Sequence, residues 1–146
     1  MPEFDKKDAL EKLRKAKGAH IKWRAYAQAL VSGVAVSEEK IPVEHTDCIF
    51  GKWYHGEGKT KLGHLISYDG IYAPHEMLHE IYKRIFQVLQ EPEKLSLKTL
   101  FSSRATRENR RMEMARTYME ELVGVSETLL RALDMLEDEI REQSDT

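Results

Sequence analysis

The chain has 146 residues, of which 41% are hydrophobic and 33% charged, and this size and apolar share suit a single domain over residues 1–146. The charges nearly cancel to a formal −2, and no apolar run approaches the ~20 residues of a membrane span, so we expect neither nucleic acid nor a membrane as a partner. The single cysteine, Cys48, excludes an internal disulfide, and the first residues lack a signal-peptide pattern, so we expect a cytoplasmic protein.

The first predicted helix spans residues 5 to about 32. Apolar side chains recur along it at spacings of three and four, which is the period of one helix face, and His20 falls on that face. The apolar members of the face are Leu10, Leu13, Trp23, Ala27, Leu30 and Val34. Ser32 and Gly33 are expected to end the helix.

The middle of the chain is rich in turns, because glycine and proline gather between residues 33 and 74. Within it we expect a short helix over about 44–54, ended by two glycines, and a further short helical piece over 60–68. An Asp-Gly pair at 69–70 predicts a turn before the next long helix.

Two longer helices are predicted in the second half. One starts at Ile71 and runs to about residue 91, with Pro74 in its first turn and His75 and His79 set into its apolar stripe. The other is expected over about 95–142. Two interleaved sets of residues recur on it every seven positions, at Met112, Met119, Ser126, Leu133 and Ile140 and at Ala115, Leu122, Leu129 and Leu136.

A seven-residue repeat of this kind forms a packing seam against other helices. The fold class expected is therefore all-α, a helical bundle of four main helices with a short additional helix. The seam is apolar at nearly every inner position, and a bundle this small has surplus apolar edge, so we expect a homodimer.

The chemistry of the chain centres on its histidines and its cysteine. His75 and His79 lie one helical turn apart on an inward face, where their ring nitrogens need partners, and either a metal ion or backbone and water would serve. His20 also faces inward, and Cys48 supplies a thiol. Three imidazoles and one thiolate form a ligand set that Zn²⁺ binds tetrahedrally.

Three other kinds of site remain open on these residues. A hemerythrin-like diiron oxygen carrier would need further histidines and bridging carboxylates, and a thiolate is out of place there. A zinc hydrolase would need an open coordination position and a general base, but Glu76 and Glu80 beside the histidine pair point away from the inward face. A purely structural zinc that holds a dimerising bundle is the last alternative.

The sequence resembles the chemoreceptor zinc-binding domain family in three blocks, H20-I-K-W23, C48-I-F-G51-K-W53-Y54 and H75-E-M-L-H79. The resemblance covers residues from about 18 to 90, and the long helix over 95–142 suits the bundle helix that follows the motif in such proteins. It implies one Zn²⁺ per chain as the cofactor, a helical bundle that pairs as a homodimer, and zinc ligands at His20, Cys48, His75 and His79.

The function that this resemblance implies is regulatory and not catalytic. Such a domain senses zinc in the cytoplasm, and in some members it senses oxidants such as hypochlorous acid. Its partner is a signalling output, either a chemoreceptor that directs chemotaxis or a diguanylate cyclase that makes cyclic-di-GMP. The chain carries no cyclase signature and no receptor signalling hairpin, so the sequence does not identify which of these outputs is regulated.

Roles can also be predicted for the residues around the expected ligands. Gly51 would let the backbone pass close to the metal or a neighbouring helix, and two tryptophans, Trp23 and Trp53, would fill the core or cover the metal from water. The other three histidines of the turn-rich middle are expected to be exposed and outside the ligand set; they are His45, His55 and His64. The first of these would reach the metal only if its segment were helical.

Overall fold

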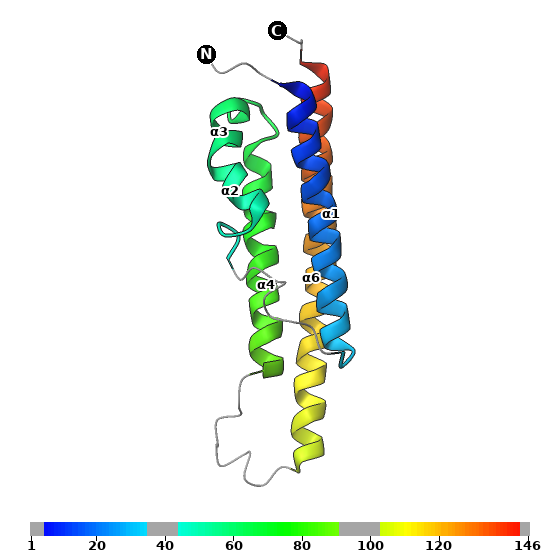
Figure 1. The fold of residues 1–146 in the computed structure, drawn as a ribbon. Helices are drawn as coiled ribbons and strands as arrows, with labels where there is room; N and C mark the ends of the chain where they lie inside the picture. The colour runs from blue at the N-terminus through cyan, green and yellow to red at the C-terminus, as the bar shows by residue number, and fades with distance from the viewer. Residues whose placement is uncertain (1–4, 35–43, 91–102, 144–146) are drawn as a thin grey trace.

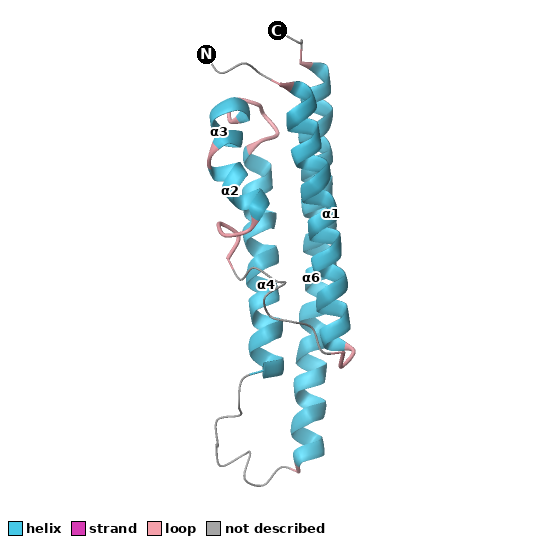
Figure 2. Cartoon of the chain, in the orientation of Figure 1, coloured by secondary structure: helices cyan, strands magenta, loops and turns pink. Residues whose placement is uncertain are grey.

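The computed structural model describes residues 5–34, 44–90 and 103–143. Within these ranges the chain is helical and contains no strand (Figure 2). The elements are α1 (Lys6–Val31), α2 (Ile49–His55), α3 (Glu57–Leu62), the 3₁₀ turn η2 (Asp69–Ile71), α4 (Tyr72–Gln90) and α6 (Arg104–Glu142). The predicted all-α bundle is confirmed; α1, α4 and α6 are long, whereas α2 and α3 are single short pieces beside α4 (Figure 1).

None of the helices in the described ranges is long and apolar enough to cross a membrane.

The three long helices form the body of the bundle, with α6 packed along both α1 and α4 and running opposite to them (Figure 1). The seven-residue seam of α6 is buried at eight of its nine positions, which are Ala115, Met119, Leu122, Ser126, Leu129, Leu133, Leu136 and Ile140. The seam is therefore filled within one chain, by α1 and α4. Met112 is only partly buried. The first turns of α6 extend beyond the ends of the other two long helices (Figure 1).

The first helix ends where the sequence predicts. At its start the Asp5 carboxylate accepts a hydrogen bond of 3.1 Å from the Asp8 backbone N–H. At its end Gly33 adopts a left-handed φ of 87°, a conformation that glycine takes without steric cost. The expectation that Val34 continues the apolar face is wrong: its side chain is 58% exposed, because the helix has already stopped at Val31.

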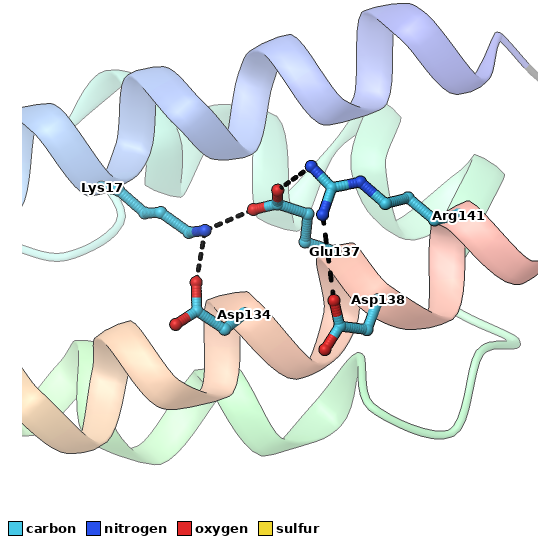
Figure 3. Close-up of polar contacts among 5 residues, drawn as sticks. All are labelled: Lys17, Asp134, Glu137, Asp138 and Arg141. Atoms are coloured by element: carbon cyan, nitrogen blue, oxygen red, sulfur yellow. Dashed lines mark hydrogen bonds and ion pairs between the residues drawn. The ribbon is translucent and has the colours of Figure 1, made fainter.

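A network of charges joins α1 to α6 (Figure 3). The Lys17 ammonium contacts the carboxylates of Asp134 and Glu137, and the latter also binds the Arg141 guanidinium at 2.5 Å. Burial opposes protonation of Lys17, but the two carboxylates outweigh it and raise its pKa. Lys17 lies one turn from His20, so this network joins α1 to α6 close to the histidine.

The segment that carries Cys48 is held to the bundle by long-range contacts. Tyr54 and Tyr68 stack with ring centroids 4.5 Å apart, and each hydroxyl donates to the other residue's carbonyl. The Glu139 carboxylate on α6 accepts from the backbone N–H groups of Ile66 at 3.1 Å and Ser67 at 2.8 Å. These bonds tie α2 to the loop that follows α3, and tie that loop to α6.

The two short helices differ from their predicted bounds. α2 begins at Ile49 and not at residue 44, because Cys48 is its N-cap and residues 44–48 form a turn. The predicted piece over 60–68 is replaced by α3, which ends at Leu62, and by turns. Gly63 follows α3 directly, and a helix this short has little propensity to continue past a glycine.

Candidate metal centre

Four residues from three elements meet in the interior of the bundle. His20 comes from α1, Cys48 from the N-cap of α2, and His75 and His79 from successive turns of α4. Each offers one nitrogen or sulfur atom, and these four atoms all lie within 4.8 Å of one another. All four residues are at most 2% exposed. The structure thus brings together the four residues that the sequence selected, and their role as zinc ligands stays a prediction.

His20 is oriented as a metal-binding imidazole. Its Nδ1–H donates to the Ala16 carbonyl oxygen at 2.6 Å, which fixes the tautomer and leaves a lone pair on Nε2. That Nε2 atom is buried and has no hydrogen-bond partner in the part of the chain that the structure describes. An unsatisfied buried polar atom costs about 1–3 kcal/mol, so a bound cation would supply the missing interaction.

The thiol of Cys48 caps the N-terminus of α2. Its Sγ is 3.4 Å from His75 Nε2, and it accepts a 3.1 Å hydrogen bond from the Gly51 backbone N–H. Tetrahedral zinc with bonds of about 2.0–2.3 Å holds its ligand atoms about 3.3–3.8 Å apart. The Cys48–His75 pair is already at this spacing, and the group of four needs only a small contraction to fit the ion.

Gly51 makes a close backbone approach beside the thiol. A Cβ atom built at this position would lie 1.7 Å from the His45 carbonyl oxygen and 3.3 Å from Cys48 Sγ. The close passage is therefore made against the 44–48 turn and the Cys48 sulfur, and not against a neighbouring helix as one of the two expectations had it. Any side chain at position 51 would push this turn and α2 apart.

Aromatic rings enclose the imidazoles on several sides. Trp23 contacts His20 and His79 edge-on, with ring centroids 4.6 Å and 5.2 Å away. Trp53 instead packs against Phe50, at 5.9 Å, and Phe50 is the residue that contacts His75, at 5.1 Å. Sequence reasoning missed this role of Phe50, although it stands two residues after the cysteine in the second block.

Burial sets the charge state of the group. Desolvation lowers the pKa of His20 to about 4, and desolvation together with the neighbouring imidazoles lowers the pKa of His75 to about 2. Burial raises the pKa of the Cys48 thiol, and the Gly51 N–H bond only partly opposes this. At neutral pH both imidazoles carry free lone pairs, while the thiol keeps its proton until a cation displaces it.

Zinc binding is expected to depend on pH through the Cys48 thiol. Since His20 and His75 are already neutral at pH 6, neither of them releases a proton to zinc, whereas the thiol does, and the affinity should rise about tenfold per pH unit from pH 6 to 8. Calorimetry in buffers of different ionisation enthalpy should count about one proton released per zinc. Release of no proton, or of two, would show that this charge assignment is wrong.

The other three histidines divide into two kinds. His55 and His64 are exposed, as expected. His45 is not, because the 44–48 turn folds it back on α4: its side chain is only 14% exposed, and its ring centroid lies 5.7 Å from that of His75. The expectation of exposure is wrong for this residue, although it is not one of the four grouped above.

Comparison with known families agrees with this geometry. The family model of the chemoreceptor zinc-binding domain matches residues 20–86. Comparisons with curated proteins and with solved structures found no match. The matched range begins at His20 and includes Cys48, His75 and His79. Residues 20–86 of this chain are therefore similar to the chemoreceptor zinc-binding domain family.

Proposed function

We propose that this protein is a regulatory zinc sensor that binds one Zn²⁺ per chain and catalyses no reaction. The ligands are His20, Cys48, His75 and His79. The observation that carries this proposal is the buried group of three imidazoles and one thiol, which lies within a range matched by a zinc-binding family.

The composition of the group favours zinc over the alternative sites. In the part of the chain that the structure describes, the group holds a thiol and no carboxylate, whereas a diiron site needs bridging carboxylates. Four protein ligands complete a tetrahedron, so no position is left for the water that a zinc hydrolase would activate. These features support a binding role over a catalytic one.

Cys48 is the ligand that can move most easily. The three histidines lie on helices of 26 and 19 residues, whereas the cysteine caps a helix of seven residues that follows a turn. Loss of the Zn–S bond would remove the main tie between α2 and the metal while the long helices keep their own packing. The signal in our proposal is the displacement of this segment, which distinguishes a sensor from a structural zinc site.

An oxidant can act on the same sulfur. Metal binding holds Cys48 as a thiolate, the form that oxidants attack. Thiolate and hypochlorous acid give a sulfenic acid and chloride, with two electrons passing from sulfur to chlorine, and further oxidation gives the sulfinic acid. Cys48 also lines a cavity of about 530 Å³ together with Trp23, Phe50 and Trp53, which gives a small oxidant a route to the site.

We further propose a cytoplasmic location and a signalling partner, a chemoreceptor or a diguanylate cyclase, as the output. The family description supports a chemoreceptor context. The buried thiol supports a reducing compartment, since a lone cysteine kept for metal binding must stay reduced at rest.

A homodimer is also expected, but for a different reason from the seam. The seam of α6 is used within the chain, whereas several large apolar side chains are exposed: Ile21, Ile49, Ile66, Met77 and Met135. The first test is light scattering of the zinc-bound protein at micromolar concentration, which should give the mass of two chains. The double variant Ile49→Glu, Ile66→Glu removes the two most exposed of these side chains and should weaken association. A zinc-bound monomer at that concentration would contradict this expectation.

Hydrogen exchange tests the sensor proposal. We expect removal of zinc, or mild treatment with hypochlorous acid, to speed exchange mainly in residues 44–54. Cys48→Ser keeps an oxygen as the N-cap of α2 and should show no further response to the oxidant. Exchange that rises equally throughout the bundle would instead show that zinc stabilises the whole fold.

A further inference from the structure

His45 lies next to the four grouped residues without being one of them. Its carbonyl oxygen is 3.4 Å from Cys48 Sγ, so the backbone of this residue borders the thiol. Its ring packs edge-on against His75, with centroids 5.7 Å apart, and it comes from the same turn that positions Cys48. A histidine of the turn that carries Cys48 thus already lies against one of the expected ligands.

The ring of His45 has unused bonding capacity on its buried side. Its Nδ1 atom is buried and has no hydrogen-bond partner among the residues of the described ranges. Its Nε2 atom is 3.8 Å from the Glu76 carboxylate, which is beyond ordinary hydrogen-bond length. A buried nitrogen without a partner destabilises the fold. If position 45 served only to fill the core, an apolar residue would do so without this cost.

We propose that His45 is a reserve zinc ligand, which replaces Cys48 on the metal when the thiol is oxidised or otherwise displaced. This inference rests on the proposed function, since it concerns the same ion. Nδ1 is the nitrogen available for the metal, and Nε2–H would donate to Glu76. A carboxylate behind a zinc-bound imidazole is a recurrent arrangement that orients the ring and raises its basicity.

The charges are consistent with this exchange. Replacing a thiolate by a neutral imidazole raises the formal charge of the site by one unit, and the Glu76 carboxylate beside His45 compensates it. Zinc would then stay bound after oxidation. The 44–48 turn would shift toward the metal as His45 binds, and α2 would lose its sulfur cap, so the conformational signal would not require release of the ion.

The test compares the zinc affinities of four full-length proteins: the unmodified chain, His45→Gln, Cys48→Ala and the double variant. His45→Gln alone should change the affinity by less than about threefold, because Cys48 still binds. In the Cys48→Ala background the same change should lower the affinity on the order of ten- to a hundredfold further. His55→Gln in that background is the matched control and should cause no further loss.

Cobalt as a probe ion reports the ligands directly. With Co²⁺, Cys48→Ala should lose the thiolate charge-transfer absorption, and its visible bands should change again in the double variant, because water then replaces the fourth nitrogen ligand. After hypochlorous acid treatment, the unmodified chain should retain its zinc, whereas His45→Gln should release it. Circular dichroism checks that each variant is helical; if Cys48→Ala does not fold, Cys48→Ser in its place keeps a cap on α2 and allows the same comparison.

Two results would be decisive against the inference. Equal affinities of Cys48→Ala and the double variant, in a protein whose unmodified chain binds zinc, would overturn the reserve-ligand role and leave the proposed function intact. An unmodified chain that binds no zinc would overturn the proposed function and this inference together.

Discussion

Alanine at any one of the four grouped residues, His20, Cys48, His75 or His79, is expected to lower the zinc affinity by at least about a hundredfold. The magnitude follows because loss of a residue that only orients a ligand already costs about 10–100-fold, and loss of the ligand itself costs more. The candidate ligand atoms of these four residues all lie within 4.8 Å of one another in the buried interior. An exposed side chain therefore cannot take the place of a missing histidine. Competition with a coloured chelator measures each affinity.

Matched controls come from the other three histidines of the chain. Alanine at His55 or His64 should leave the affinity unchanged, because both are exposed. Alanine at His45 in the otherwise unmodified chain should also have little effect, since Cys48 is present. A chain that loses zinc with His45→Ala but keeps it with His20→Ala would show that the ligand set is wrongly assigned.

Gly51→Ala is expected to be as damaging as the loss of Cys48 itself. The added Cβ would lie 1.7 Å from the His45 carbonyl oxygen, and the nearest atoms belong to backbone, which cannot rotate away. The turn and α2 must therefore separate, which moves Cys48 from its position 3.4 Å from His75. We expect a loss of about 1–3 kcal/mol in the free energy of unfolding, with zinc affinity reduced as for Cys48→Ala.

Two other glycines provide the control for this substitution. Gly18 lies within α1 and Gly124 within α6, and a Cβ at either would meet nothing within 4 Å. Alanine at these positions should stabilise the protein by up to about 1 kcal/mol, because glycine is the poorer helix former. Urea unfolding measures all three variants. Unchanged zinc binding in Gly51→Ala would show that the close approach does not hold the thiol in place.

Much of this architecture could be predicted from local sequence patterns. The spacing of apolar residues predicts α1, α4 and the end of α6 to within a few residues, because each long helix buries one continuous stripe. The same periodicity places His20, His75 and His79 inside, since all three fall on those stripes. The start of α6, predicted near residue 95, is Arg104 in the structure; residues 95–102 lie outside the described ranges.

The rest depends on contacts between residues far apart in the sequence. The start of α2 is set by a bond from the Gly51 N–H to the Cys48 sulfur, which a helix pattern does not encode. The loop after α3 is held by Glu139, more than 70 residues away. The burial of His45 follows from the way its turn packs on α4. Local periodicity carries no information on such pairings, so the exposure of His45 was wrongly predicted.

The central claim is that each chain holds one zinc ion through three histidines and Cys48. Metal analysis of the protein purified without added metal tests it most directly, with Cys48→Ala purified in parallel. One zinc per chain, with less in the variant after dialysis against a weak chelator, is the expected result. Two irons per chain, or a zinc content that does not depend on Cys48 under that competition, would contradict it.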